Sequence, residues 1–179
     1  VFAFLDQGDA LSMEQADRFS LALEGQFSIG LAVEDSESNL IYRAAKLYRS
    51  GDVPPVAFRL DKKLPIAAGL GGGSADAAAA LRLLNENSDA PLGAKELHAI
   101  AAQLGADVPA CIESLPVVGR GTGTLLEPVE NDVSGLHCLL VNPNIAMSTG
   151  PVFKAWDGVD RGPMPQGSAL FIMQHGRND

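Results

Sequence analysis

The chain has 179 residues, of which 46% are hydrophobic and 20% are charged, and its 13 Lys and Arg against 22 Asp and Glu give a net charge of −9. These values are typical of a globular chain with a sizeable core and exclude disorder over most of the length. The acidic balance disfavours binding to nucleic acid or to anionic membranes, which both need a basic surface. Because no apolar run reaches membrane-spanning length and the first residues do not resemble a signal peptide, we expect a cytoplasmic protein.

The first half of the chain alternates predicted strands with one helix. Residues 1–5 are a short apolar run typical of a strand, and residues 19–23 alternate apolar with polar or small side chains, a rhythm that residues 27–31 continue. Residues 40–48 have helical spacing behind the pair Ser38-Asn39, which can cap the first turn. Residues 56–61 alternate again and predict a further strand.

The second half begins with two helical patterns. Residues 75–85 are rich in alanine, the best helix former, and residues 94–104 place their apolar side chains on one face before Gly105, a typical C-terminal cap. Residues 117–126 predict strand and turn, and residues 136–141 predict a buried strand. The mixed order, without regular strand–helix alternation, favours the α+β class.

The strongest chemical feature is the loop Gly69-Leu-Gly-Gly-Gly-Ser74 between a predicted strand and the alanine-rich helix. Glycines allow successive backbone N–H groups to face one point, and the start of the helix adds a positive dipole end, so this arrangement predicts an anion site. The Ser74 hydroxyl is suited to a phosphate or to a phosphate-bound magnesium ion, and Lys62 and Lys63 can offset phosphate charge. A β-branched residue at Gly72 is expected to abolish binding, because it resists positive φ and crowds the anion. The plain alternative is a flexible connecting loop.

Spacing excludes two common phosphate motifs at this loop. A P-loop places Lys directly after its last glycine, and no Lys follows these glycines. The dinucleotide pattern Gly-x-Gly-x-x-Gly needs a third glycine where this chain has Ser74, counted from Gly69, or Asp76, counted from Gly71.

Asp107 is the second feature, in Leu104-Gly-Ala-Asp-Val-Pro109, just before a short predicted helix. One interpretation is a simple helix cap. The other is a catalytic base, since an aspartate with an ordinary pKa of about 3.9 is ionised at neutral pH and accepts a proton from a substrate hydroxyl.

The two cysteines, Cys111 and Cys138, are too few for a disulfide scaffold or a four-ligand zinc site, and they predict small core residues in a reducing compartment. The three histidines, His98, His137 and His175, share no ligand spacing with each other or with the cysteines, which argues against a metal site built from them.

Several of these segments together resemble the GHMP kinases, a superfamily named after galactokinase, homoserine kinase, mevalonate kinase and phosphomevalonate kinase. Residues 65–78, Pro-Ile-Ala-Ala-Gly-Leu-Gly-Gly-Gly-Ser-Ala-Asp-Ala-Ala, are similar to the second motif of that family. The triple glycine resembles the branch that phosphorylates diphosphocytidyl-methylerythritol in non-mevalonate isoprenoid synthesis, whereas mevalonate and homoserine kinases more typically carry Gly-Leu-Gly-Ser-Ser. Residues 38–45, 104–109 and 143–154 fit the same branch in the same order.

This resemblance implies a two-lobed kinase that uses ATP and Mg²⁺ to phosphorylate the 2-hydroxyl of that small molecule. Residues 1–142 would form the N-terminal, ATP-binding lobe, and residues 143–179 would begin the C-terminal lobe. Asp107 would deprotonate the acceptor hydroxyl, Thr149 and Phe153 would surround the cytidine, and Ser74 would contact magnesium. The implied ATP-binding residues are Asn39, Leu40, Lys62, Pro65, Ala68, Gly69, Leu70, Gly71, Gly72, Gly73 and Ser74.

Two parts of the family pattern have no counterpart in the sequence: an N-terminal segment with a Lys and a Tyr-His pair, and a C-terminal glycine-rich motif. We therefore expect the chain to correspond to the middle of such an enzyme. Three other interpretations stay open, namely another small-molecule GHMP kinase, a nucleotide-binding fragment without catalytic activity, and an interaction domain whose glycine loop holds nothing.

Overall fold

A computed structural model describes residues 1–29, 36–121, 123, 125–141, 149–159, 162 and 165–175. Its main sheet has three strands in the order β1-β3-β2. Strand β1 (Ala10–Gln15) runs antiparallel to β3 (Val56–Asp61), which runs parallel to β2 (Ser20–Glu24). A separate antiparallel hairpin pairs β4 (Val117–Arg120) with β5 (Leu125–Pro128).

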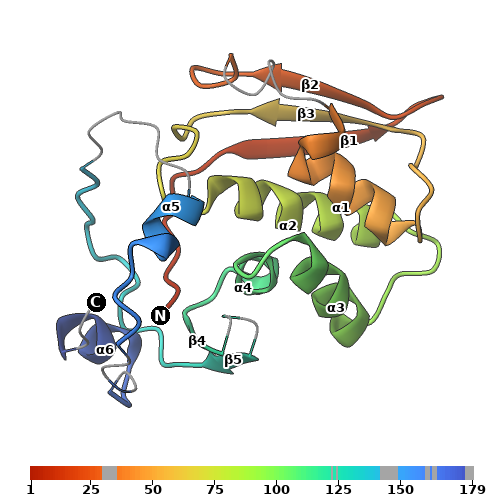
Figure 1. The fold of residues 1–179 in the computed structure, drawn as a ribbon. Coiled ribbons are helices and arrows are strands. Elements are labelled where there is room, and N and C mark those ends of the chain that lie inside the picture. Colours follow the sequence, from red (N-terminus) through yellow and green to blue (C-terminus); the bar gives the residue numbers. More distant parts are fainter. Residues whose placement is uncertain are drawn as a thin grey trace.

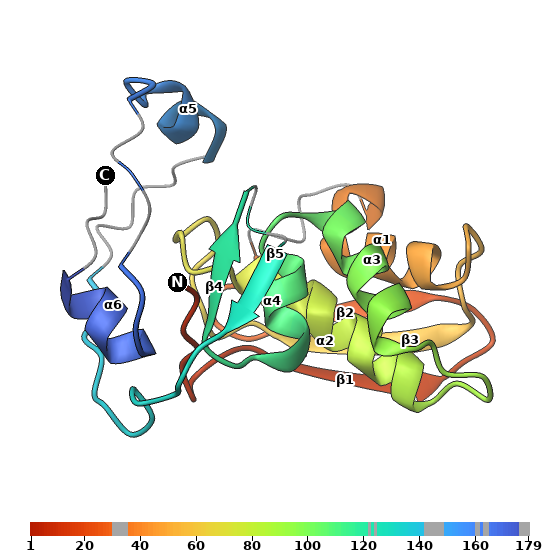
Figure 2. The same ribbon diagram turned by 90° about the horizontal axis from the view of Figure 1, so that it is seen from below.

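The helices form two further layers on one face of the main sheet (Figure 1). Figures 1 and 2 show α1 and α2 against the sheet, with α3 and α4 on the far side of these two helices. Figure 2 shows α5 and α6 to one side of the layered part. Besides the short 3₁₀ turn Ser36–Ser38, the helices are α1 (Leu40–Tyr48), α2 (Gly72–Glu86), α3 (Ala94–Leu104), α4 (Val108–Glu113), α5 (Thr149–Lys154) and α6 (Ala169–His175).

The core lies between the sheet and the first helix layer. Strand β3 turns Val56, Phe58 and Leu60 inward, and each of these side chains is buried. The facing positions of the helices are alanines without exposed surface, namely Ala44, Ala45, Ala77, Ala78 and Ala80. Because an alanine side chain is a single methyl group, α1 and α2 can approach each other and the sheet closely.

The local signals placed most of these elements correctly. Helix α1 begins behind Asn39, whose Oδ1 accepts a hydrogen bond from the Ile41 N–H at 2.8 Å. Helix α3 has the predicted bounds and ends at Gly105. Strands β2 and β3 lie where alternation predicted them, and the β4–β5 hairpin lies where strand and turn were predicted. The α+β expectation is confirmed by the mixed sheet with helices on one face.

Two strand predictions at the amino-terminal side are wrong. Residues 1–5 form only an isolated bridge, in which Phe2 pairs with Val117. The rhythm of residues 19–23 does not continue through 27–29, because the chain turns at Gly25, where φ is +91°. Leu31, the last residue of that predicted pattern, lies outside the described residues. Strand β1 and helices α5 and α6 were not predicted.

The predicted buried strand over 136–141 is also wrong. This segment has no regular structure, and its large apolar side chains are between 45% and 87% exposed. The hydrophobicity of a short run does not show whether a neighbouring strand is present to bury it. Cys138 within it is exposed and Cys111 on α4 is buried, so the expectation of two core cysteines holds for Cys111 only. The predicted lobe boundary at residue 142 falls outside the described residues and stays a prediction.

No helix among the described residues has the length and apolar character needed to cross a membrane.

Candidate active site

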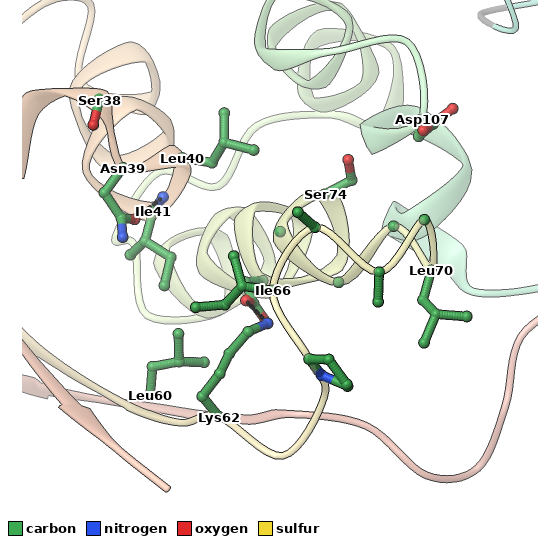
Figure 3. A pocket seen from close by; sticks show the side chains of 18 residues that line it. Ser38, Asn39, Leu40, Ile41, Leu60, Lys62, Ile66, Leu70, Ser74 and Asp107 are labelled. Carbon is green, nitrogen blue, oxygen red and sulfur yellow. Dashed lines mark hydrogen bonds and ion pairs between the residues drawn. The ribbon is translucent and has the colours of Figure 1, made fainter. Parts of the chain in front are cut away.

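A cavity of about 390 Å³ lies where α1, α2, the end of β3 and the start of α4 meet (Figure 3). The loop from Pro65 to Gly71 forms one wall, and the first turn of α2 closes it. It is lined by Ser38, Asn39, Leu40, Ile41, Leu60, Lys62, the continuous run 65–74, Asp76 and Asp107. Every residue expected to bind ATP lines this one cavity, as does the expected catalytic base.

The glycines of the loop serve two different purposes. Gly69 and Gly71 have φ values of +73° and +70°, and an added Cβ at either would meet nothing within 4 Å. These two positions therefore need glycine for backbone conformation, and they leave open space beside the main chain. Gly72 and Gly73 are the first residues of α2 and have ordinary φ values, so the positive φ expected at Gly72 is wrong.

Crowding explains the glycine at position 72. A Cβ there would lie 3.2 Å from Lys62 Nζ and 3.4 Å from Asp9 Oδ2, closer than most real contacts. A Cβ at Gly73 would meet only Leu40 Cδ1, at an ordinary 3.6 Å. The first glycine of the helix thus allows α2 to begin directly against two charged groups.

The start of α2 is suited to an anion. Gly71 caps the helix in the left-handed conformation, and its carbonyl accepts the first helical hydrogen bond, from the Ala75 N–H at 2.9 Å. The N–H groups of the three preceding residues, Gly72 to Ser74, therefore lie at the helix end that carries the positive dipole. In Figure 3 the Ser74 hydroxyl points to the side of the loop on which Asp107 lies.

The opposite end of the cavity is more apolar. Leu40 and Ile41 of α1 and Leu60 of β3 contribute aliphatic surface, with Asn39 at the rim. Because the Asn39 carbonyl oxygen is held by the α1 cap, the orientation of its amide group is fixed. A flat ring with a polar edge fits such a mixture of aliphatic walls and one oriented amide.

Lys62 is placed differently from the sequence expectation. Its side chain is 4% exposed, and its ammonium contacts Asp9 Oδ2 and, at 3.0 Å, Asp76 Oδ2. The positive charge of Lys62 was expected to offset phosphate charge, but it is paired with two buried carboxylates. Burial raises the pKa of Asp76 to about 6, although Lys62 acts in the opposite direction. Lys63 is at the surface, and its Nζ lies 3.5 Å from Asp61 Oδ2.

Asp107 is exposed and immediately precedes α4. It occupies the capping position, but its side chain makes no capping hydrogen bond. Helix α4 is attached to α2 at its other end, because Arg82 Nη1 donates to the carbonyl oxygens of Cys111 at 2.6 Å and Ile112 at 3.2 Å. Asp107 thus lines the cavity at the start of a helix whose other end is fixed to α2.

The remaining expectations concern metal and acceptor residues. Thr149 and Phe153 belong to α5, but their side chains lie outside the described part of the structure. Among the described residues, no group of three or more His, Cys, Asp or Glu is placed to hold a metal ion. Sequence reasoning missed Asp9 altogether and assigned no role to Asp76, although the latter stands inside the quoted glycine motif.

Comparison with known proteins places this site in a family context. Residues 39–114 match the model of the GHMP kinases N terminal domain. The whole chain is 49% identical to the 4-diphosphocytidyl-2-C-methyl-D-erythritol kinase of Novosphingobium aromaticivorans, of which it covers 60%. It is 48% identical to the protein of the same name from Rhizorhabdus wittichii, of which it covers 62%.

Solved structures agree with this. A crystal structure of 4-(cytidine 5'-diphospho)-2C-methyl-D-erythritol kinase matches with a TM-score of 0.53 and 36% identity over 68% of this chain and 42% of that chain. A homoserine kinase from Cytophaga hutchinsonii matches with a TM-score of 0.56 over 70% of this chain and 44% of that chain, but at 20% identity, so it supports the fold alone.

The chain thus spans about 60% of the length of these two curated relatives. The matched segment 39–114 contains both the glycine loop and Asp107, which are the two features that meet at the cavity. On these grounds residues 39–114 are similar to the N-terminal domain of the GHMP kinases, and the whole chain is similar to kinases that carry one common name.

Proposed function

We propose that the protein containing this chain transfers the γ-phosphoryl group of ATP to the 2-hydroxyl of 4-diphosphocytidyl-2-C-methyl-D-erythritol, in the cytoplasm. The observation that carries the proposal is that the glycine loop, the start of α2 and Asp107 line one cavity. The names of the relatives support the choice of acceptor, since the identity of 49% extends over the whole chain.

The residues divide the work between binding and proton transfer. The backbone of Gly69 to Ser74 would hold the ATP phosphates, with the open space at Gly69 and Gly71 allowing close approach. The apolar end formed by Leu40, Ile41 and Leu60 would take the adenine ring. Phosphoryl transfer depends mainly on positioning and charge stabilisation, so a fixed backbone cradle and one base are appropriate parts.

Asp107 would act on the acceptor. As the hydroxyl oxygen of the acceptor bonds to the γ-phosphorus, the bond from that phosphorus to the bridging oxygen of ADP breaks. The hydroxyl proton passes to the Asp107 carboxylate, and ADP leaves. The absence of a capping hydrogen bond from Asp107 supports this role, since a carboxylate engaged in a cap would be a poorer acceptor.

Magnesium fits the donor chemistry of the site. Mg²⁺ is usually held by one or two protein oxygens together with the phosphates and water, so a single hydroxyl group beside the phosphates is a sufficient contribution from the protein. Ser74 would contribute its hydroxyl at the start of α2. When bound, the ion neutralises phosphate charge.

The test is a phosphorylation assay on the full-length protein. With ATP and Mg²⁺, we expect ADP release and a phosphorylated product from diphosphocytidyl-methylerythritol, and none from homoserine or mevalonate. Phosphorylation of one of those two acceptors instead would assign a different GHMP kinase activity. ADP binding without turnover of any acceptor would assign a nucleotide-binding role, and failure to bind nucleotide would contradict the proposal entirely.

The cytoplasmic part of the proposal rests on the cysteines and on ATP. Cys111 and Cys138 are both free, and Cys138 is exposed, which suits a reducing compartment with ATP available. Oxidation of Cys138 in freshly isolated protein would argue against this location.

A further inference from the structure

Three charged side chains are enclosed beneath the glycine loop, on the side toward the sheet. The exposed fractions of the Lys62, Asp9 and Asp76 side chains are 4%, 3% and 9%. Lys62 Nζ contacts a carboxylate oxygen of both aspartates. We call these three residues the buried ion cluster. Charged residues are almost never buried so completely unless they are paired, and removing one partner leaves an uncompensated charge inside the protein.

The cluster joins three elements that surround the loop. Asp9 immediately precedes β1, Lys62 follows the last residue of β3, and Asp76 lies in the second turn of α2. The segment that leads into the cavity wall begins after Lys62 and ends where α2 begins. The Lys62 ammonium therefore connects both ends of this segment to Asp9, at the start of β1.

Asp9 also holds the root of the loop through its second oxygen. Asp9 Oδ1 accepts hydrogen bonds from the backbone N–H groups of Lys63 at 2.6 Å and Leu64 at 2.8 Å. Together with the contact to Lys62, this single carboxylate binds three consecutive residues that lead directly into Pro65. Hydrogen bonds from charged acceptors are the stronger kind, and burial strengthens them further.

The start of α2 lies against the same cluster. A Cβ on Gly72 would come within 3.2 Å of Lys62 Nζ and 3.4 Å of Asp9 Oδ2. Movement of Asp9 or Lys62 would therefore displace the helix end whose N–H groups face the cavity. The cluster consequently sets the loop and the helix end in one arrangement.

We propose that Asp9 is a positioning residue for nucleotide binding: it holds the root of the glycine loop directly and the first turn of α2 through Lys62. The inference rests on the proposed function, because it takes the cavity to be a nucleotide site. Asp9 is not among the residues that line that cavity. It acts only through the backbone and the ammonium that it binds.

The test compares two Asp9 variants with a matched surface control in the full-length protein. Asp9→Ala removes all three contacts, whereas Asp9→Asn keeps an oxygen for the two backbone N–H groups and removes the charge. The control is Glu24→Ala, which breaks an exposed ion pair with Arg59. Circular dichroism establishes that each variant is folded before any binding is measured.

We expect the dissociation constant of ADP, measured by calorimetry, to rise about tenfold in Asp9→Ala and about threefold in Asp9→Asn, with no change in the control. In the kinase assay the KM for ATP should rise while kcat at saturating ATP and the KM for the acceptor stay within about twofold. A merely structural role would reduce the active fraction and leave both KM values alone.

Amide hydrogen exchange without nucleotide separates the two proposals. Exchange of residues 63–74 should accelerate in both variants, while exchange in α3 stays at the wild-type rate. If exchange accelerates but wild-type protein binds no nucleotide, the proposed function fails and the nucleotide-binding role of Asp9 fails with it, although Asp9 still holds the loop. If Asp9→Asn is folded and matches wild type in loop exchange and ADP affinity, the positioning role is overturned, even where Asp9→Ala does not fold.

Discussion

The two sides of the glycine loop differ in almost every physical property. Toward the sheet, Asp9, Lys62 and Asp76 are enclosed and pair with one another. Toward α4, Asp107 is exposed and makes no capping bond. Charged side chains that are paired and buried hold the structure in place but cannot reach a substrate. An exposed carboxylate on a fixed helix can contact one. The comparison teaches that acidic residues beside one loop can differ in role: Asp9 and Asp76 are paired beneath it, and we propose that Asp107 reacts beside it.

The largest effect should follow from breaking the reactive side. Asp107→Asn keeps the shape of the side chain but removes the proton acceptor. We expect kcat to fall on the order of 10³-fold, the usual scale of general-base contributions, with the ADP dissociation constant within about threefold of wild type. Steady-state kinetics and calorimetry measure the two quantities. Normal turnover would show that Asp107 only marks the start of α4.

The next effect concerns the contact between helix and cluster. Gly72→Val places a branched side chain against Lys62 Nζ, so we expect ADP binding to weaken at least tenfold and the melting temperature to fall. Gly93→Ala is a suitable control, since Gly93 also starts a helix and an added Cβ there meets only Glu96, at 3.6 Å. Unchanged ADP affinity in Gly72→Val would contradict the close approach of α2 to the cluster.

A smaller, pH-dependent effect should come from the enclosed side. The pKa of Asp76 is raised to about 6 from an ordinary 3.8, so the folded state holds this proton more tightly than the unfolded state. Its contribution to the free energy of unfolding is therefore full below about pH 4 and declines as pH rises through 6. The amide side chain in Asp76→Asn cannot ionise, so this variant does not lose that part of the free energy of unfolding as pH rises.

Thermal melts of both proteins between pH 4 and pH 8 measure this contribution as a difference. The stability of Asp76→Asn relative to wild type should increase through the window from about 4 to 6 and then level off. Taking the difference cancels the carboxylates that titrate alike in both proteins. A difference that is flat with pH would mean that Asp76 remains ionised within the cluster throughout.

The division between the two sides could be predicted only in part from the sequence. Local signals identified the glycine loop, α3 with its Gly105 cap, and the placement of Asp107 before α4, because each depends on residues close together in the chain. The enclosed side depends on Asp9 meeting Lys62 across 53 residues, and no periodicity carries that information. A lysine at a strand end is ordinarily solvated, so only the fold shows that this one is buried.

The exposed apolar run over 136–141 shows the converse error. Its composition predicts burial as strongly as that of β3, yet only β3 has strands on both sides to complete it. The composition of a segment indicates how much free energy it would gain from burial. Whether it is buried depends on the neighbouring strands or helices that the fold provides.

The smallest expected effect uses the two cysteines as reporters of the same comparison. Cys111 is buried on α4, and burial, followed by the nearby charge of Asp107, raises the pKa of its thiol to about 11. The thiolate is the nucleophile, so at pH 7.5 iodoacetamide should modify exposed Cys138 rapidly and Cys111 slowly in native protein. Removing the charge in Asp107→Asn should accelerate modification of Cys111 by no more than a few fold, since burial, the larger cause, is unchanged. Mass spectrometry of the two peptides over time measures both rates. A large acceleration would show that the charge of Asp107, and not burial, is the larger cause of the slow reaction of Cys111.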